Sequence, residues 1–476
     1  MVASGGDPAG RIRAVRDGGR CPRTASGVGA VLLLGVTLAV LLAALPALGD
    51  APPASRSDDL SRPDGGAARV EPDPGAASVT GAPDQHGPTW LPDDIVDQLE
   101  GRLAELADGL ARADAEAVAA VLRDADGEVA QRWRTRAANL ADVPFDELRL
   151  RLDPRPGVMT SRHVRARFDD VDEVVVVGAV EEHVLAGQDH DGPARHRHTL
   201  TFVREHGEWL LADDRDGRAL GRPEPGFLWD LAPVVSTRQG PVLALYTEEA
   251  TGVGPLVAET VAAMRVLPSR WPGEWSQRTT LVVPADREQL SHVLGGTLEL
   301  DDFLAFTSAT THSAPGVHEL TGTRLVINPG PFPDAPESRE RVLLHELVHV
   351  ATRPVASARL PMWLEEGIAQ ALGEQGPSTG HTRGLAAAGP AGRRLPTDAE
   401  FSAAGRQATH LAYQRAYSFL DHLVERSGRE AVVDFYTAVG ASATQPGTLR
   451  HRLDAAAGRE LGADLDTLVA EWRADG

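Results

Sequence analysis

The segment "SRERVLLHELVHVATRP" at residues 338–354 holds two histidines and a glutamate inside an otherwise apolar run. Its apolar flanks predict a buried helix, where polar side chains are tolerated only when they are paired or bind something. Residues four apart share one face of a helix, so His345 and His349 can reach the same metal ion. Glu346 lies one residue further round, close enough to contact a water on that ion without binding the ion itself. The sequence therefore predicts a metal site on this helix.

A second predicted helix, at 361–372 ("PMWLEEGIAQAL"), offers a third ligand. Hydrolytic zinc sites use three protein ligands and a water, so the two histidines need one more partner. We expect that partner to be Glu366, with Glu365, which points about 100° away around the helix, as the competitor. Gly367 costs about 1 kcal/mol relative to alanine in a helix, which indicates that another helix or a metal approaches closely there.

The pattern H-E-x-x-H followed by W-L-x-E-G-x-A resembles that of the gluzincin metallopeptidases. The chain from about residue 235 to 476 is similar to the peptidase MA-like branch of that clan. The resemblance implies a mainly helical, zincin-type domain with a small sheet. It also implies one Zn²⁺ ion held by the two histidines and Glu366, with Glu346 as the catalytic base.

A later helix, "AYQRAYSFLDHL" at 412–423, is similar to the gluzincin segment whose tyrosine stabilises the oxyanion. This match implies that Tyr413 has that role. Helical spacing alone does not distinguish Tyr413 from His410 or Tyr417, which lie within one turn on the same side.

The chain also departs from related patterns. Metzincins carry glycine and histidine where this chain has Thr352 and Val355, so that class is excluded. Thermolysin-like proteins carry an aspartate where this chain has Gln370, so the sequence identifies no residue that orients His345. Gluzincin aminopeptidases have a G-x-M-E-N motif, which is missing between residues 231 and 345; an endopeptidase is therefore favoured over an exopeptidase.

These features predict that the protein is a zinc-dependent metallopeptidase that hydrolyses peptide or protein substrates. The alternative is a catalytically inactive, membrane-anchored scaffold or binding protein that keeps zinc as a structural ion. The Gly/Pro-rich loop at 374–396 is interpreted either as a border or lid of the cleft or as an ordinary surface insertion.

The N-terminus predicts attachment to a membrane. Residues 1–27 carry five arginines, and residues 28–48 form an uncharged apolar run of 21 residues, long enough to span a bilayer with the basic end in the cytoplasm. We expect a single-pass anchor with extracytoplasmic domains, and a cleaved signal with secretion as the alternative. Residues 49–89 are rich in Pro, Ala, Gly and Ser, which predicts a disordered tether.

Charge and cysteine content exclude other classes of function. The net charge of −21 argues against a nucleic-acid partner, because such proteins need basic surface. The single cysteine, Cys21, excludes an intramolecular disulfide and a multi-cysteine metal site.

Residues 90–230 are predicted to form an α+β domain, in which helices precede long antiparallel strands. Helices are expected at 92–112 and 114–140. Strands are expected at 163–168, 173–185, 196–205 and 208–214. This order of elements resembles the nuclear transport factor 2-like cone.

His196 and His198 alternate along one of these strands and therefore point to the same face. Spacing adds no carboxylate or third histidine, so we expect a solvent-facing polar stripe opposite Leu200 and Phe202 instead of a metal site.

Residues 231–476 are predicted to form the zincin-type domain. Its expected elements before the metal-site helix are a helix at 253–266 and strands at 241–247, 279–285 and 324–330.

Overall fold

The computed structural model describes most of the chain from residue 91 onward. The described residues are 36–37, 91–153, 162–168, 170–188, 191–216, 226–296, 303–314, 317–356, 360–373, 393–402, 406–442 and 447–475. The predicted segments 1–27 and 49–89 lie outside them, as does most of the loop at 374–396. Of the predicted anchor at 28–48 only Val36–Thr37 is described, as the short strand β1. Within these described stretches, no helix is both long and apolar enough to cross a membrane.

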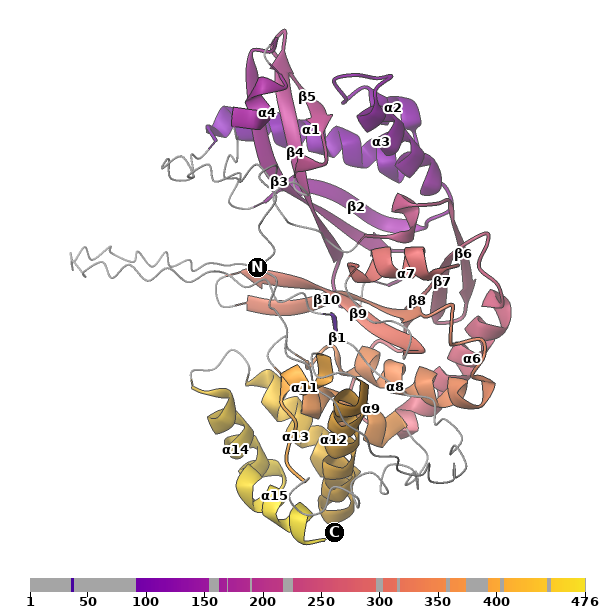
Figure 1. The fold of residues 1–476 in the computed structure, drawn as a ribbon, viewed down its shortest axis with the longest axis vertical. Helices are drawn as coiled ribbons and strands as arrows, with labels where there is room; N and C mark the ends of the chain where they lie inside the picture. Colours follow the sequence, from indigo (N-terminus) through magenta and orange to yellow (C-terminus); the bar gives the residue numbers. More distant parts are fainter. Residues whose placement is uncertain are drawn as a thin grey trace, which may run out of the picture. The chain divides into compact units, whose positions relative to one another are not determined.

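A four-stranded antiparallel sheet, in the order β2-β3-β4-β5, follows three N-terminal helices. Figure 1 draws the helices in indigo and the strands in magenta. The helices are α1 Asp93–Ala111, α2 Ala115–Ala119 and α3 Glu128–Asn139, and the strands are β2 Phe145–Leu152, β3 Glu173–Leu185, β4 Ala194–Glu205 and β5 Glu208–Asp213. Helix α1 contacts β2 and buries its apolar stripe, which confirms the periodicity read from the sequence.

Two predictions for this region are wrong. The single helix expected at 114–140 is divided into α2 and α3, because an Asp/Gly turn that ends at Gly127 interrupts it. The strand expected at 163–168 is instead the helix α4, Arg162–Ala166. Val164 and Phe168 lie four residues apart and pack into one small apolar cluster, a spacing that suits a helix.

The prediction that His196 and His198 form a solvent-facing stripe is also wrong. Residues two apart in a strand share a face, so these histidines point to the same side as the buried Leu200 and Phe202. Their rings lie 4.5 Å apart, and Nε2 of His198 lies 3.0 Å from the buried carboxylate of Glu181. The two histidines belong to the interior of the sheet.

The second sheet has six strands in the order β1-β9-β10-β8-β7-β6. Its later strands are β6 Val234–Gln239, β7 Val242–Thr247, β8 Thr279–Val283, β9 Ala305–Ala314 and β10 Val317–Ile327. Strand β8 runs parallel to both of its neighbours, β7 and β10, whereas β6, β9 and β1 pair antiparallel. The crossover helix α6, Val253–Val266, has the bounds expected from the sequence, and α7, Arg287–Leu294, follows β8.

Helices dominate the chain after β10, shown from orange to yellow in Figure 1. They are α8 Arg339–Thr352, α9 Met362–Gly373, α11 Asp398–Ser402, α12 Arg406–Ser427, α13 Arg429–Ala441, α14 Leu449–Glu460 and α15 Leu465–Ala474. Short 3₁₀ turns are η1 Leu228–Asp230, η2 Leu267–Ser269 and η3 Pro336–Ser338. The expected α+β mixture of helices and strands is confirmed, and most buried apolar side chains belong to one continuous core.

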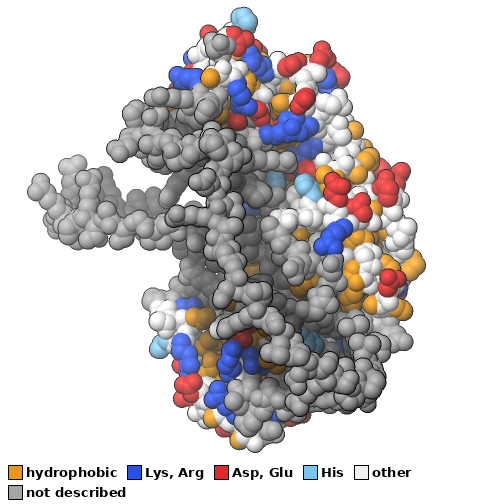
Figure 2. All heavy atoms as spheres, viewed as in Figure 1, with side chains coloured by type: hydrophobic (Ala, Val, Ile, Leu, Met, Phe, Trp, Pro, Cys, Tyr) orange, Lys and Arg blue, Asp and Glu red, His pale blue; other side chains and the backbone are white. Residues whose placement is uncertain are grey.

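Acidic and basic side chains are interspersed over the described part of the face drawn in Figure 2. Mixed charge of this kind is typical of a solvated surface.

Candidate metal centre

Helices α8 and α9 carry the predicted site, and each is buried over most of its length. Val342, Leu343, Leu347 and Val348 of α8 are at most 1% exposed. Pro361 precedes the first turn of α9 as expected, and Asp398 of α11 accepts a hydrogen bond of 2.9 Å from the backbone N–H of Met362. The apolar residues of both helices thus bury them in the protein. The few polar residues of the two helices face each other.

Two glycines let α9 approach its neighbours closely. A Cβ on Gly373 would lie 2.9 Å from the backbone N and Cα of His345 on α8. A Cβ on Gly367 would lie 2.9 Å from the carbonyl oxygen of Ala416 and 2.7 Å from Leu420, both on α12. The sequence-based expectation of a close approach at Gly367 is confirmed, and the approaching element is a helix.

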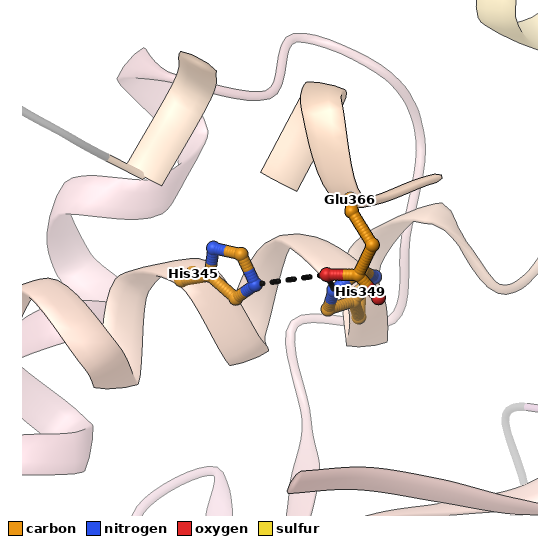
Figure 3. A group of neighbouring side chains, drawn as sticks. All are labelled: His345, His349 and Glu366. Atoms are coloured by element: carbon orange, nitrogen blue, oxygen red, sulfur yellow. Dashed lines mark ion pairs between the residues drawn. The ribbon is translucent and has the colours of Figure 1, made fainter. Parts of the chain in front are cut away.

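His345, His349 and Glu366 meet between α8 and α9 (Figure 3). Oε2 of Glu366 lies 3.5 Å from Nε2 of His345 and 3.5 Å from Nε2 of His349. Their candidate ligand atoms all lie within 4.8 Å of one another, and each residue is at most 1% exposed. In the part of the chain that the structure describes, no other set of three or more His, Cys, Asp or Glu side chains converges in this way.

The ligand atoms of this group are unpaired inside the protein. Both Nε2 atoms of the histidines and both carboxylate oxygens of Glu366 are buried without a hydrogen bond in the described structure. Contacts of 3.5 Å are longer than hydrogen bonds of good geometry. Because an unpaired buried polar group is costly, the convergence of one unpaired ligand atom from each of the three residues fits a bound cation. These residues can therefore hold a metal ion.

Burial sets the protonation of the ligands. It lowers the pKa of His345, and Glu366 opposes this shift. It lowers the pKa of His349 to about 3, with help from the positive charge of Arg353. Both imidazoles are therefore neutral near pH 7, which is the form that binds a metal. Burial also raises the pKa of Glu366, and a cation would favour the ionised carboxylate instead.

Glu346 lies beside the group and is held by a strand. The hydroxyl of Thr307, on β9, donates to Oε2 of Glu346 at 2.7 Å, and Oε1 is buried without a partner. Burial raises the pKa of Glu346 well above its ordinary value, against the opposing effect of Thr307. One oxygen is thus fixed in place while the other is left to accept a proton.

The competitor ligand, Glu365, is not part of the group. Its carboxyl is buried, which raises its pKa to about 7, while Arg353 opposes the shift. Gln370 lies one turn beyond Glu366 on the same face of α9, and its side chain acts with Glu366 to oppose the lowered pKa of His345. A neutral amide therefore contacts His345 from the position at which thermolysin-like proteins carry an aspartate.

Tyr413, predicted to stabilise an oxyanion, lies on α12 and is 7% exposed. Its ring packs edge to face on Phe401, with the centroids 4.9 Å apart. On the same helix, Tyr417 is buried and Nε2 of His410 lies 2.7 Å from the amide nitrogen of Gln414. The contacts with Phe401 and with Gln414 do not involve the ligand group.

Three neighbours of the site escaped prediction. Thr307 comes from a strand, and no spacing in the sequence connects it with α8. Tyr436 of α13 is fully buried, and burial together with the charge of Glu365 raises the pKa of its hydroxyl. Arg353 is 4% exposed and lies four residues after His349. The same helical spacing that pairs the histidines could have identified Arg353.

No protein-family model and no curated protein matches the chain. The geometry of the site therefore carries the functional argument.

Proposed function

We propose that this protein is a zinc-dependent metallopeptidase of the gluzincin type, and an endopeptidase. The observation that carries the proposal is the set of unpaired ligand atoms on His345, His349 and Glu366, with the carboxylate of Glu346 beside them. The resemblance of residues 235–476 to the peptidase MA-like branch adds to it. The expected cone-like form of residues 90–230 is likewise our inference from the order of elements.

Zinc suits the donor set better than other common divalent ions. Two imidazoles and one carboxylate match catalytic zinc sites, whereas magnesium and calcium prefer oxygen ligands alone. Tetrahedral zinc with bonds of about 2.0–2.1 Å separates its ligand atoms by about 3.3 Å. The two His–Glu distances of 3.5 Å are close to that value.

In this proposal, Glu346, Thr307 and Tyr413 each have a separate role in the reaction. When bound, zinc supplies a Lewis acid that lowers the pKa of a water ligand to about 7. Oε1 of Glu346 takes the proton of the attacking water and returns it to the departing amine. Thr307 holds the other oxygen of Glu346 at 2.7 Å, so that the free oxygen keeps one direction. The Tyr413 hydroxyl is the proposed donor to the oxyanion.

The proposed substrate is a peptide or protein outside the cytoplasm, and residues 28–48 would anchor the enzyme to the membrane. The uncharged length of this segment and the five arginines before it support that location. Secretion after cleavage is the alternative.

The decisive test compares Glu346→Gln with Glu340→Gln in the full-length protein. Glu340 is exposed in the first turn of the same helix and serves as the matched control. We expect both variants to bind about one zinc per chain, by elemental analysis. Glu346→Gln should hydrolyse casein about 10²–10⁴-fold more slowly than the parent, whereas Glu340→Gln should match it.

Two outcomes would contradict the proposal. If Glu346→Gln cleaves casein as fast as the parent, the assigned base is wrong. If the parent binds zinc tightly but cleaves neither casein nor a mixture of unstructured peptides, the scaffold with a structural zinc is correct. His345→Ala distinguishes zinc binding at this site from adventitious zinc, because it should lose the ion.

A second comparison tests the oxyanion donor. Tyr413→Phe should lower kcat about 10²-fold or more with little change in KM, because the hydroxyl acts only in the transition state. Tyr436→Phe removes the buried hydroxyl on the Glu365 side of the site. If Tyr436→Phe shows the larger loss of kcat, the role belongs to Tyr436.

A further inference from the structure

A cavity lies where the end of the four-stranded sheet meets the six-stranded sheet, away from the metal group. Both sheets belong to one compact unit, Gly35–Gly476. The cavity has a volume of about 40 Å³ and is lined from both sides, with residues of β3 and η1 facing residues of β8 and β10. A single water needs about 10–15 Å³ by this measure, so there is room for a small polar group with several heavy atoms.

Arg324 of β10 lines this cavity and is itself buried. It is 7% exposed, and Nε of its guanidinium is buried without a hydrogen-bond partner in the described structure. It lies over the ring of Phe227 at 4.8 Å. Burial lowers its pKa to about 10, with the charge of Asp230 as the opposing effect. A buried cation without a partner is costly, which indicates that a ligand completes it.

Other polar groups of the lining are unpaired as well. Both the oxygen and the nitrogen of the Gln188 side-chain amide are buried without a hydrogen bond, as are Nδ1 of His183 and the hydroxyl of Thr323. Gln188 is 6% exposed and His183 is 3% exposed. Native structures rarely leave several buried polar atoms unsatisfied in one place unless water or a ligand serves them.

The aromatic wall of the cavity is held in place by helices α3 and α7. Phe227 and Trp229 stack with centroids 4.5 Å apart, and Asn139 of α3 donates to the carbonyl of Trp229 at 2.9 Å. Asp230, in the same turn, pairs with Arg136 at 2.9 Å and with His292 of α7 at 3.2 Å. The wall is therefore formed before any ligand arrives, which reduces the entropic cost of binding.

We propose that this cavity is a binding site for a small organic carboxylate, held by the guanidinium of Arg324 with its apolar body against Phe227 and Trp229. A guanidinium pairs with a carboxylate through two parallel hydrogen bonds. Asp191 also lines the cavity and accepts a hydrogen bond of 2.8 Å from the backbone N–H of Thr323. Its negative charge beside a single cation favours a monoanion over phosphate. This inference goes beyond the proposed peptidase function and does not rest on it.

The test is calorimetric titration of the full-length protein with acetate and propionate, each against its uncharged amide, and with inorganic phosphate. We expect at least one carboxylate to bind about tenfold or more tightly than its amide and more tightly than phosphate. Arg324→Met should lower its affinity about tenfold or more. Arg265→Met, which changes an exposed arginine on α6, should leave the affinity unchanged.

Gln188→Leu is the second variant, and it keeps the guanidinium. It should weaken carboxylate binding while the protein stays folded, and it carries the test if Arg324→Met does not fold. The proposal is overturned if amide and carboxylate bind equally, if phosphate binds more tightly, or if Arg324→Met or Gln188→Leu binds like the parent. An equal loss in Arg265→Met would show that the binding is not at this cavity. None of these readouts depends on zinc or on peptide hydrolysis.

Discussion

The metal group and the interior of the four-stranded sheet both bury several ionisable side chains. In the sheet these side chains pair with one another, whereas in the metal group they do not. In the sheet, Arg136 pairs with Glu181 at 2.7 Å and with Asp230 at 2.9 Å, and His198 adds a second partner for Glu181 at 3.0 Å. In the metal group, the atoms that face each other have no partner. Buried charges that neutralise one another are a structural set, whereas an incomplete set identifies a place for a ligand.

The largest expected effect removes one member of the structural set. Burial opposes ionisation of Glu181, but Arg136 and His198 outweigh it and hold the pKa of that carboxyl well below its ordinary range. Glu181→Ala leaves Arg136 with Asp230 alone, and we expect the free energy of unfolding to fall by about 3 kcal/mol. Urea denaturation measures it.

The matched control for this change is Glu208→Ala. Glu208 has 69% of its side chain exposed and lies 3.4 Å from Arg102, so its loss should cost less than about 1 kcal/mol. Equal losses in the two variants would show that the buried pair contributes no more than a surface pair.

The next effect is a dependence of stability on pH that comes from His183, a buried neighbour of the structural set. Burial lowers the pKa of His183 from its ordinary value of 6.5 to about 4, and Glu181 opposes the shift. Between these values the unfolded chain binds more protons than the folded one, so stability falls as pH falls through this window. We expect His183 to contribute about 2–3 kcal/mol to this loss.

Replacing the histidine isolates its part of the pH dependence. His183→Phe should flatten the decline in the free energy of unfolding between pH 6.5 and about 4, as followed by urea denaturation at a series of pH values. His206→Gln, in an exposed turn, should leave the decline as it is in the parent. If both variants keep the full decline, burial of His183 is not its cause.

The smallest effect concerns Gln370, which lies beside the metal ligand His345. Gln370→Leu removes the amide beside His345 and should weaken zinc binding about 10–100-fold, measured by competition with a chelator. Gln289→Leu, also buried but on α7, should bind zinc like the parent. Parent-like affinity in Gln370→Leu would mean that His345 needs no such support.

Local periodicity accounts for the parts of the fold that were predicted correctly. The apolar stripe of α1, the bounds of β3 and the bounds of α6 all follow from patterns within one element. Predictions for short segments were less reliable. The six residues at 163–168 are compatible with both a strand and a helix, and the packing of Val164 and Phe168 in the folded protein determines which one forms.

The candidate site was predictable where it lies within helices. His345, His349 and Glu366 converge as their spacing suggested. Thr307 was not predictable, because its contact with Glu346 joins residues 39 apart through the pairing of the sheet. Arg324 was not predictable either, because only the meeting of two sheets turns an ordinary strand residue into a buried cation.

The two glycines of α9 have a consequence for the choice of metal. Gly373 brings α9 against the backbone of α8, and Gly367 brings its middle against α12. The helix that carries Glu366 is therefore packed between two others, which hold its ligand in a fixed position relative to the two histidines. Because affinity alone ranks copper above zinc for most protein sites, a fixed coordination geometry is one of the few means of discrimination left to a protein. Here two missing methyl groups help to set that geometry.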